Sequence, residues 1–475
     1  DYQPDGIYSL NFGNAASAKA ADEIRESKTQ SVFGRFNYNY REKYLLEANL
    51  RYDGSSRLAP ENRWKLFPSV ALGWVVSKER FLRNVKAIDM LKVRASWGQL
   101  GNATAIGYYD YIPVVEDGTT IFGGGMEATN YVATLASLQK TWETIEIQNI
   151  GLDLALLNQR LQFSGDYYVK RNKNMLSQTK WVPSLIGVNV PYLNVGELKT
   201  WGWEFEITWR DRIGKDFNYF VSFNLSDSQN KLVKYEGENI VGEGIVQLLQ
   251  GYPMNTIWGY QTNGLFQEKP SSEVANYQPG KSLTGAGDVI YVNRDDDPNI
   301  TIGDGTPANP GDLVVLGTTD PRYTFGLNLG FEWKRFSFSI MLQGVGKRKF
   351  LLDEETLNPT AGSLYQAVDF HRDYWTPDNR DAFFPRPVYK GGSYNYKPSD
   401  RWIQDGSYIR LKNIQIGYTI PIKKSFIENV YVSGDNLYEW TNTWKSFDPE
   451  APAVASSQEW YAFFRSVSFG LNLTF

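Results

Sequence analysis

The chain has 475 residues, which is long for one ordinary soluble domain, yet no Pro/Ser-rich linker divides it. Its formal net charge of -4 argues against a nucleic-acid-binding protein, and the lack of cysteine excludes disulfides and thiol chemistry. The hydrophobic fraction is 42%, the mean hydropathy is -0.42, and no unbroken apolar run is long enough for a membrane-spanning helix.

Apolar and polar residues alternate in many long segments along the chain. In YLLEANLRYDG, for example, Tyr44 and Leu46 share one face and Glu47 and Asn49 share the other. This period of two predicts strands with one apolar face. We count about thirteen such strands, near residues 30–40, 44–54, 65–76, 90–99, 144–156, 161–170, 200–210, 217–226, 323–333, 335–344, 405–420, 428–438 and 465–475.

The length of these segments and the aromatic residues at their ends point to a membrane. Most segments reach about ten residues, the length that a tilted strand needs to cross a bilayer, whereas globular strands average about five or six. Tyr and Trp recur at the strand ends, as in the aromatic girdles of outer-membrane barrels. A soluble propeller would show repeats of about 40–50 residues, and the sequence shows none. We therefore predict an all-β fold, a transmembrane antiparallel β-barrel with long extracellular loops.

Short and long connections alternate, as periplasmic turns and extracellular loops do in such barrels. A turn of intermediate length, at 77–89, is predicted to carry a short helix. Counting strand directions places the C-terminal strand 465–475 downward, with Phe475 in the periplasm. The short connections lie at 41–43, 77–89, 157–160, 210–216, 333–335 and 421–429, and the long ones at 54–64, 100–142, 172–195, 227–322, 346–404 and 441–460.

Two segments depart from the simple scheme. PMNTIWGYQTNGLFQ (253–267) reads as a strand, but one extra membrane crossing would reverse every later direction. We therefore place it inside one large extracellular excursion, 227–322, paired with another segment of 268–322. SYIRLKNIQIGY changes the phase of its alternation, which predicts a β-bulge near Lys412–Asn413.

Several long blocks resemble the SusC/RagA family of TonB-dependent outer-membrane transporters from Bacteroidetes-type bacteria. The resemblance implies a 22-stranded barrel around a plug, energised through TonB, with a SusD-like surface lipoprotein as lid and oligosaccharides or peptides as cargo. It also implies that a terminal aromatic residue, here Phe475, is an assembly signal. The blocks are 31–82, LKVRASWGQLGN (91–102), NIGLDLALL (149–157), GSYIRLKNIQIGYTIP (406–421) and VSGDNLYEWT (432–441).

The sequence shows no plug, TonB box or N-terminal extension of that family. About thirteen of 22 strands leaves about nine unaccounted for, so we expect 1–475 to be the C-terminal portion of the barrel, with 1–29 an extracellular link after strand nine. DYQPDGIYSL carries no Met and no signal peptide, as in a processed product or a fragment. We expect the partner to be an N-terminal part of the transporter that carries the plug and the remaining strands. The strand at 30–40 should pair either with a strand of that part or with Ile7–Leu10.

The sequence offers little for catalysis or metal binding. The single histidine, His371, has no Cys or second His to work with, so we interpret it as a loop-packing residue and predict no enzyme activity. Asp295, Asp297 and Asn299 have the spacing of a calcium loop. Ile300 stands where such a loop needs Gly, so a solvated turn is favoured over calcium, and we expect no cofactor.

Cargo must meet the extracellular loops and the lumen wall. Aromatic rings in or beside the long loops are the candidates for contact, because flat rings stack on sugars. The alternative for each is packing of loop against loop, or contact with the lid lipoprotein. A soluble or secreted β-rich glycan-binding module remains the second functional hypothesis. The candidates are Trp181, Tyr192, Trp258, Tyr260, Tyr365, Trp375, Tyr394, Tyr396 and Trp444.

Overall fold

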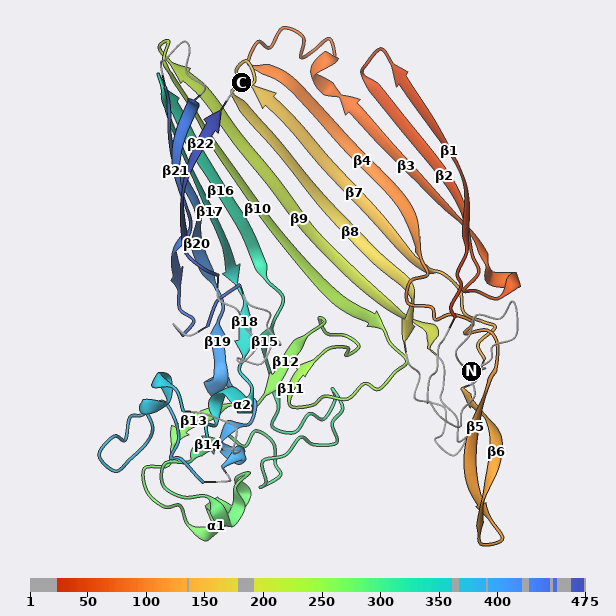
Figure 1. The fold of residues 1–475 in the computed structure, drawn as a ribbon, viewed down its shortest axis with the longest axis vertical. Helices are drawn as coiled ribbons and strands as arrows, with labels where there is room; N and C mark the ends of the chain where they lie inside the picture. The colour runs from red at the N-terminus through yellow and green to blue at the C-terminus, as the bar shows by residue number, and fades with distance from the viewer. Residues whose placement is uncertain are drawn as a thin grey trace, which may run out of the picture.

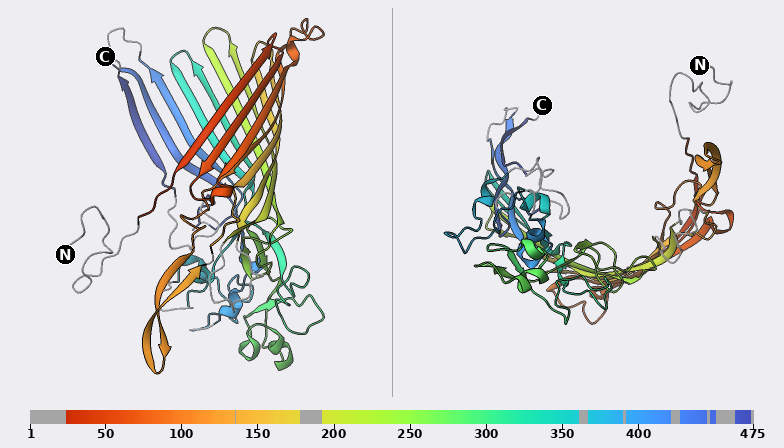
Figure 2. Two further views of the ribbon diagram at one scale, coloured as in Figure 1. Left: turned by 90° about the vertical axis from the view of Figure 1, so that its right-hand side faces the viewer. Right: turned by 90° about the horizontal axis from the view of Figure 1, so that it is seen from below.

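The fold is dominated by one antiparallel sheet that curves into a trough (Figures 1 and 2). The computed structural model describes residues 24–134, 136–177, 192–360, 367–389, 392–420, 427–444, 447–450 and 463–473. Within these ranges the sheet has 13 strands. In sheet order they are β1 (Thr29–Tyr40), β2 (Tyr44–Ser55), β3 (Trp64–Val75), β4 (Ile88–Asn102), β7 (Glu143–Leu156), β8 (Leu161–Ser177), β9 (Leu193–Ile213), β10 (Phe217–Lys234), β16 (Arg322–Trp333), β17 (Phe336–Lys347), β20 (Tyr408–Thr419), β21 (Ile427–Thr441) and β22 (Ser466–Leu473).

Each of these strands coincides with one of the predicted segments, so the strand prediction is confirmed. Every strand of the sheet pairs antiparallel with its neighbour in chain order, once the small loop strands are left out. The outer strands β1 and β22 do not pair with each other in the described residues, so the sheet is an open trough. Residues Ile7–Leu10 and Phe475 lie outside the described residues.

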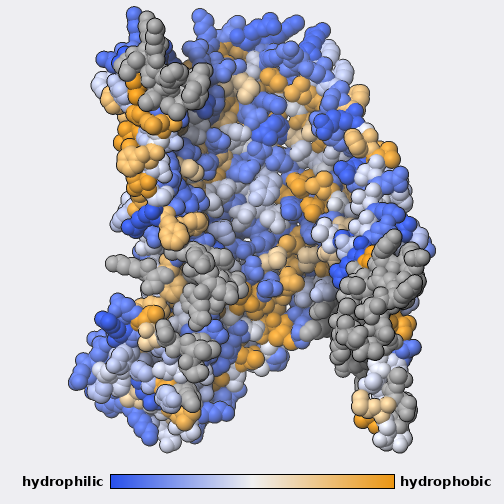
Figure 3. Space-filling view, viewed as in Figure 1, coloured by the Kyte–Doolittle hydropathy of each residue, from blue (hydrophilic) through white to orange (hydrophobic). Residues whose placement is uncertain are grey.

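The register keeps the two faces of the sheet chemically distinct. On β9, Ile207 lies opposite Phe163 of β8 and Phe223 of β10, in one apolar row. The neighbouring Glu206 belongs to the other face and accepts a hydrogen bond from the Ser222 hydroxyl at 3.2 Å. Alternation of side chains across a strand produces this separation. Figure 3 looks into the trough and shows hydrophilic residues over much of its inner surface, interspersed with hydrophobic ones.

Glycines in the strands make room for large rings on neighbouring strands. A Cβ on Gly330 of β16 would lie 2.7 Å from the ring of Phe220 on β10. Gly202 of β9 stands in the same relation to the hydroxyl and ring of Tyr168 on β8. An aromatic ring that lies over a cross-strand glycine covers exposed backbone and fixes the register. These glycines therefore belong to strand pairing and not to turns.

All the short connections meet at one end of the sheet, the turn end, and all the long ones at the other, the loop end (Figure 1). At the turn end Tyr40 and Tyr44 stack with ring centroids 6.4 Å apart, and Trp333 and Phe336 do so at 6.5 Å. Aromatic rings at strand ends are typical of membrane interfaces. The turn after β3 carries a short 3-10 helix, η3 (Val76–Lys78), which confirms the predicted helix.

The predicted β-bulge is present. On β20, Leu411 pairs with Tyr438 and Asn413 with Asp435, so the register shifts across Lys412. The same shift appears on the other side of the strand, against β17. An extra residue in one strand leaves it unpaired and bends the strand locally.

The connection 100–142, predicted as a loop, contains a long hairpin of β5 (Val114–Phe122) and β6 (Gly125–Thr134). It reaches the foot of the molecule, apart from the loop around α1 (Figures 1 and 2). The sequence predicted a long connection here but did not reveal the hairpin within it. Ile121 and Met126 near its tip are exposed.

Short elements fold the two longest loops. The predicted strand at 253–267 is split in two: β12 pairs with β11 and β15, and β13 pairs with β14, which confirms its pairing inside the excursion. The elements are β11 (Gly244–Val246), β12 (Thr256–Gly259), β13 (Thr262–Leu265), β14 (Val289–Tyr291), β15 (Val314–Thr318), β18 (Lys349–Leu351), β19 (Ile403–Asp405), α1 (Ser272–Tyr277), α2 (Glu354–Leu357), and the 3-10 helices η5 (Lys281–Leu283), η6 (Asp369–Arg372), η7 (Ser393–Tyr396) and η8 (Asp400–Trp402). A further 3-10 helix, η2 (Pro60–Asn62), lies between β2 and β3.

Residues 235–321 pack together with 348–360, 367–389 and 392–407 into what we call the loop unit. Tyr260 donates its backbone N–H to the Pro398 carbonyl at 2.9 Å, and its own carbonyl accepts from Asp400 N–H at 3.0 Å. Two hydrophobic clusters fill the unit, one around Trp258 and Trp375 and one around Trp402. In the parts of the chain that the structure describes, no helix is long and apolar enough to cross a membrane.

Candidate functional site

The polar face of the sheet carries ion pairs that link neighbouring strands. Arg94 of β4 binds Asp153 of β7 at 2.8 Å and Asp166 of β8 at 2.9 Å, so one guanidinium joins three strands. Guanidinium groups suit this role because their donors form a planar fork that matches carboxylates. The inner face of the trough therefore carries paired charges, which make it suited to contact with water and polar solutes.

A hollow of about 820 Å³ lies on this polar face near the turn end. Its lining includes Arg210, Arg212, Asn218, Phe220 and Gln415, from β9, β10 and β20. Arg160 and Asp211 also line it, and their side chains lie 3.3 Å apart. The lining thus combines arginine side chains with aromatic rings, among them Phe220, Phe331 and Phe338.

A second hollow, of about 700 Å³, lies in the loop unit, and we call it the loop hollow. Four separate stretches meet there: the stretch at β11, the stretch around η5, the junction of β18 and α2, and the stretch around η7. Its lining comprises Glu243, Ile245, Pro279, Gly280, Leu283, Leu351, Leu352, Asp353, Glu354, Ser393, Tyr394, Tyr396, Lys397 and Pro398.

Glu243 organises one wall of the loop hollow. Its Oε1 accepts from the Tyr260 hydroxyl at 2.7 Å and from Lys397 Nζ at 2.6 Å. Burial, and then the hydrogen bond to Glu243, raise the pKa of Tyr260 well above its usual value, so the phenol stays protonated and donates. The ammonium group of Lys397 is therefore already paired with a carboxylate of the hollow, that of Glu243.

Tyr394 forms another wall and is anchored from behind. Its hydroxyl lies 3.2 Å from Oδ2 of Asp288, and burial raises its pKa to about 12. The ring lies against Gly280, where a Cβ would come within 2.8 Å of it. Glycine at this position lets the two loop stretches approach closely.

Asp288 connects the two long loops behind this wall. Its side chain is fully buried and accepts from Arg386 at 2.8 and 3.0 Å and from Asn395 Nδ2 at 2.9 Å. A buried charge is tolerated when it is paired and hydrogen-bonded in this way. Hydrogen bonding to Asp288 raises the pKa of Arg386 further above its ordinary value.

The structure separates the predicted cargo-contact residues into three groups. Trp258, Tyr260, Trp375 and Tyr396 are buried, with 2 to 8% of their surface exposed, and belong to the two hydrophobic clusters. For these four, packing of loop against loop describes what the structure shows. Tyr394 and Trp444 are partly buried, and Tyr192 is 50% exposed. Trp181 and Tyr365 lie outside the described residues.

The loop with calcium-like spacing folds through its own backbone. Oδ1 of Asp295 accepts from the N–H of Asp297, and Oδ1 of Asp297 accepts from the N–H of Asn299, both at 3.0 Å. Such contacts are typical of Asx turns. In the described ranges, no group of three or more His, Cys, Asp or Glu side chains is placed to hold a metal ion.

Glu243, Asp353, Glu354 and Lys397 are polar residues of the loop hollow that sequence reasoning did not select. They come from three separate stretches of the chain, with Glu243 more than a hundred positions before the others, so no local motif marks them. His371 is 8% exposed and contacts Phe370 and Phe384, as expected for a loop-packing residue.

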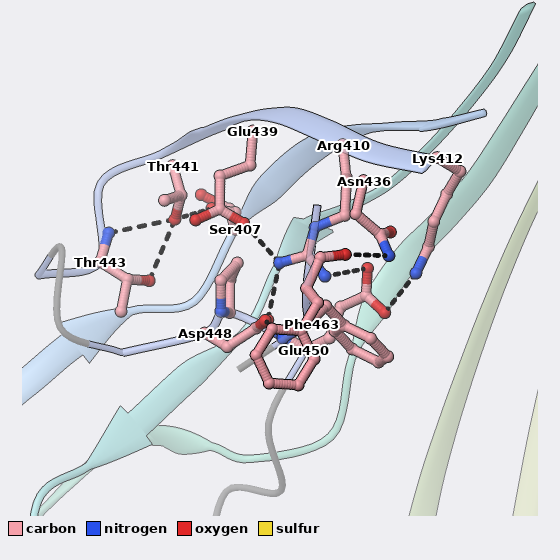
Figure 4. A network of polar contacts seen from close by, with 12 residues as sticks. Ser407, Arg410, Lys412, Asn436, Glu439, Thr441, Thr443, Asp448, Glu450 and Phe463 are labelled. Atoms are coloured by element: carbon pink, nitrogen blue, oxygen red, sulfur yellow. Dashed lines mark hydrogen bonds and ion pairs between the residues drawn. The ribbon is translucent and has the colours of Figure 1, made fainter. Parts of the chain in front are cut away.

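Arg410 is the centre of a further network, at the loop end of β20 (Figure 4). Only 2% of its side chain is exposed, and it binds Glu439 of β21 together with Asp448 at 2.7 Å and Glu450 at 3.0 Å. Lys412 also reaches Glu450, at 2.8 Å. The stretch after β21 is thereby fastened to the inner face of the sheet.

A long, curved antiparallel sheet with an apolar outer face, short turns at one end and folded loops at the other defines a transmembrane β-barrel of the outer-membrane type. Residues 1–437 match the family described as TonB dependent receptor-like, beta-barrel. The chain belongs to this family and is a β-barrel protein of the bacterial outer membrane.

Curated relatives agree with the family match. TonB-dependent receptor P3 of Formosa agariphila is 30% identical over 92% of this chain and 44% of its own length. TonB-dependent receptor SusC of Bacteroides thetaiotaomicron is 27% identical over 94% of this chain and 43% of its own length. The chain thus spans less than half the length of these relatives. The resemblance to the SusC/RagA family is confirmed.

Solved structures of the RagAB peptide transporter share the fold. One superposes with a TM-score of 0.73 at 23% identity, and covers 96% of this chain and 49% of the other. A "closed-closed" state of the RagAB peptide importer gives the same TM-score at 22% identity.

Proposed function

We propose that this chain forms the barrel wall and cargo-facing loops of a SusC-like importer that takes up oligosaccharides or peptides. The observation that carries the proposal is the combination of family membership with a polar, hollowed inner face beneath a folded loop unit. An importer needs a polar path through the bilayer and a site where cargo is first held. The inner face of the trough supports the first role and the loop hollow the second.

The proposal includes energy from TonB and a SusD-like surface lipoprotein that covers the loop end. The names of the curated relatives support the first. The resemblance to SusC/RagA transporters supports the second. We propose no catalytic role, because the relatives are named as receptors and the His371 ring is used in packing. The trough and the family match favour this function over a secreted glycan-binding module.

The test is uptake by whole cells. The gene for the full-length receptor is deleted in its host, and uptake of labelled oligosaccharide and peptide mixtures is compared with that of the parent strain. We expect the deletion strain to lose uptake of one class of cargo. The same uptake should be lost in a strain in which TonB is inactivated. Unchanged uptake of both classes after deletion contradicts the proposal.

A further inference from the structure

We propose that the loop hollow binds a cationic side chain, so that the cargo held there is a peptide containing lysine or arginine. This inference rests on the proposed import function and narrows its cargo. Three features of the hollow support this inference. Carboxylates outnumber ammonium groups in its lining, part of the lining is apolar, and only one of the aromatic rings in the lining is open to a ligand.

The first feature is charge. Three carboxylates, those of Glu243, Asp353 and Glu354, line the hollow against one ammonium group, that of Lys397. Lys397 is already bound to Glu243 at 2.6 Å. The lining therefore carries a net charge of minus two, with Asp353 and Glu354 left to attract a cation.

These two carboxylates retain acceptor capacity. Oδ1 of Asp353 accepts from the N–H of Thr356 at 2.8 Å, and Oε1 of Glu354 accepts from Asn358 Nδ2 at 3.4 Å. For the second oxygen of each, the described part of the chain supplies no hydrogen-bond donor. A carboxylate can accept at both oxygens, and a bidentate guanidinium or an ammonium fits such a pair.

The second feature is the apolar wall beside the carboxylates. Leu283, Leu351, Leu352 and Pro398 line the same hollow. Lysine and arginine carry a long alkyl stem beneath the charge, and that stem is stabilised by apolar surface while the head group stays polar. The ring of Tyr394, partly exposed in another wall of the hollow, adds an electron-rich face that attracts a cation.

The third feature separates peptide from sugar. Sugar recognition by stacking needs open aromatic faces, but Tyr396 is only 8% exposed and stacks on Trp402 with ring centroids 5.4 Å apart. Trp258 and Trp375 are equally buried in the loop unit. Tyr394 alone among the rings lining the hollow is accessible, which suits a single side chain better than a sugar chain.

The experiment uses the full-length receptor in detergent and a matched pair of fluorescent hexapeptides. One peptide carries a single lysine, and the other is identical except that this lysine is acetylated, which removes the charge. We expect the lysine peptide to bind about three- to tenfold more tightly, and the difference to shrink at high salt because screening weakens charge attraction.

Two neighbouring substitutions locate the effect. Glu354→Gln removes a carboxylate from the hollow and should abolish most of the preference for the lysine peptide. Glu355→Gln, on the same short helix but outside the lining, should leave it unchanged. Thermal unfolding of both variants checks that α2 and its surroundings remain folded.

Equal binding of the two peptides, or binding of a neutral maltooligosaccharide in their place, overturns the inference. So does a preference that Glu355→Gln removes as fully as Glu354→Gln. Each of these results leaves the import function standing, because import is tested separately by uptake in the deletion strain.

Discussion

The guanidinium of Arg386 lies against both carboxylate oxygens of Asp288, at 2.8 and 3.0 Å, although the two residues are 98 positions apart in the sequence. Asp288 is completely buried and Arg386 is one-third exposed. The pair joins the two long loops at the back of the loop hollow. Its integrity therefore decides whether the loop unit keeps its shape.

We expect Asp288→Ala to destabilise the loop unit by about 3 kcal/mol, because it leaves a partly buried guanidinium and the Asn395 amide without their acceptor. Thermal melting followed by tryptophan fluorescence measures the change, since Trp258, Trp375 and Trp402 lie in the same unit. Arg372→Met is the control. Its pair with Asp369 is 85% and 88% exposed and should contribute less than about 1 kcal/mol. Comparable losses in both variants would contradict the assignment.

The imidazole of His371 should report on acidification of the loop unit. Its Nδ1 accepts from the N–H of Val368 at 3.1 Å and its Nε2 donates to the Thr356 carbonyl at 3.0 Å, which requires the neutral ring. Burial lowers the pKa of His371 below the usual 6.5. The unfolded chain therefore takes up the proton more readily, so stability is full above about pH 6.5 and falls as the pH drops below that value.

NMR titration of the ring protons measures this pKa directly, because the sequence contains a single histidine. We expect a midpoint below 6.5. In His371→Phe the loop unit should lose the part of its pH dependence that falls between neutral and mildly acidic pH. A midpoint above 6.5, or an unchanged pH profile in the variant, would show that the neutral ring is not required.

The sheet was predictable because each strand has different surroundings on its two faces. Lipid on one side and a polar interior on the other impose the alternation seen around Ile207 and Glu206. The β5–β6 hairpin has no such constraint. Its sequence places Val114 and Val115 together and then Glu116 and Asp117, so the period of two is lost. Its strands were therefore missed, although the glycines at 123–125 mark a turn.

The loop unit was less predictable, for two physical reasons. An aromatic residue in a loop gives the same signal whether it contacts cargo or fills a core, and burial alone separates Trp258 from Tyr192. Charged residues such as Asp288 and Arg410 acquire their roles through partners that are distant in the sequence. Neither a window nor a motif brings such residues together.

The two faces of β9 should respond oppositely to substitution. Ile207→Arg places a charge on the apolar face and should cost about 2–4 kcal/mol if this position lies at the bilayer midplane. Glu206→Gln on the polar face should change stability little, because its hydrogen bonds from Thr208 and Ser222 can be accepted by an amide oxygen. Folding titrations in lipid vesicles compare the two. Equal effects would refute the assignment of the faces.

The Arg410 network should respond to substitutions in a direction set by its charge balance. Arg410 and Lys412 face three carboxylates, those of Glu439, Asp448 and Glu450, so the cluster has one negative charge in excess. Arg410 also lies 5.1 Å from the ring of Phe463, which helps to exclude water. We expect Arg410→Met to destabilise the protein by about 3–5 kcal/mol, since it leaves carboxylates clustered without their central cation.

Glu439→Gln should behave differently, because it brings the same cluster to two positive and two negative charges while the amide can still accept from Arg410. We expect this variant to match the stability of the parent or to exceed it. The exposed pair of Arg35 and Glu47, 4.0 Å apart, supplies the control: Arg35→Met should cost less than about 1 kcal/mol. Unfolding in urea, followed by the heat-dependent shift in gel mobility, measures all three. If Glu439→Gln is as damaging as Arg410→Met, geometry and not charge balance holds the stretch after β21 against the sheet.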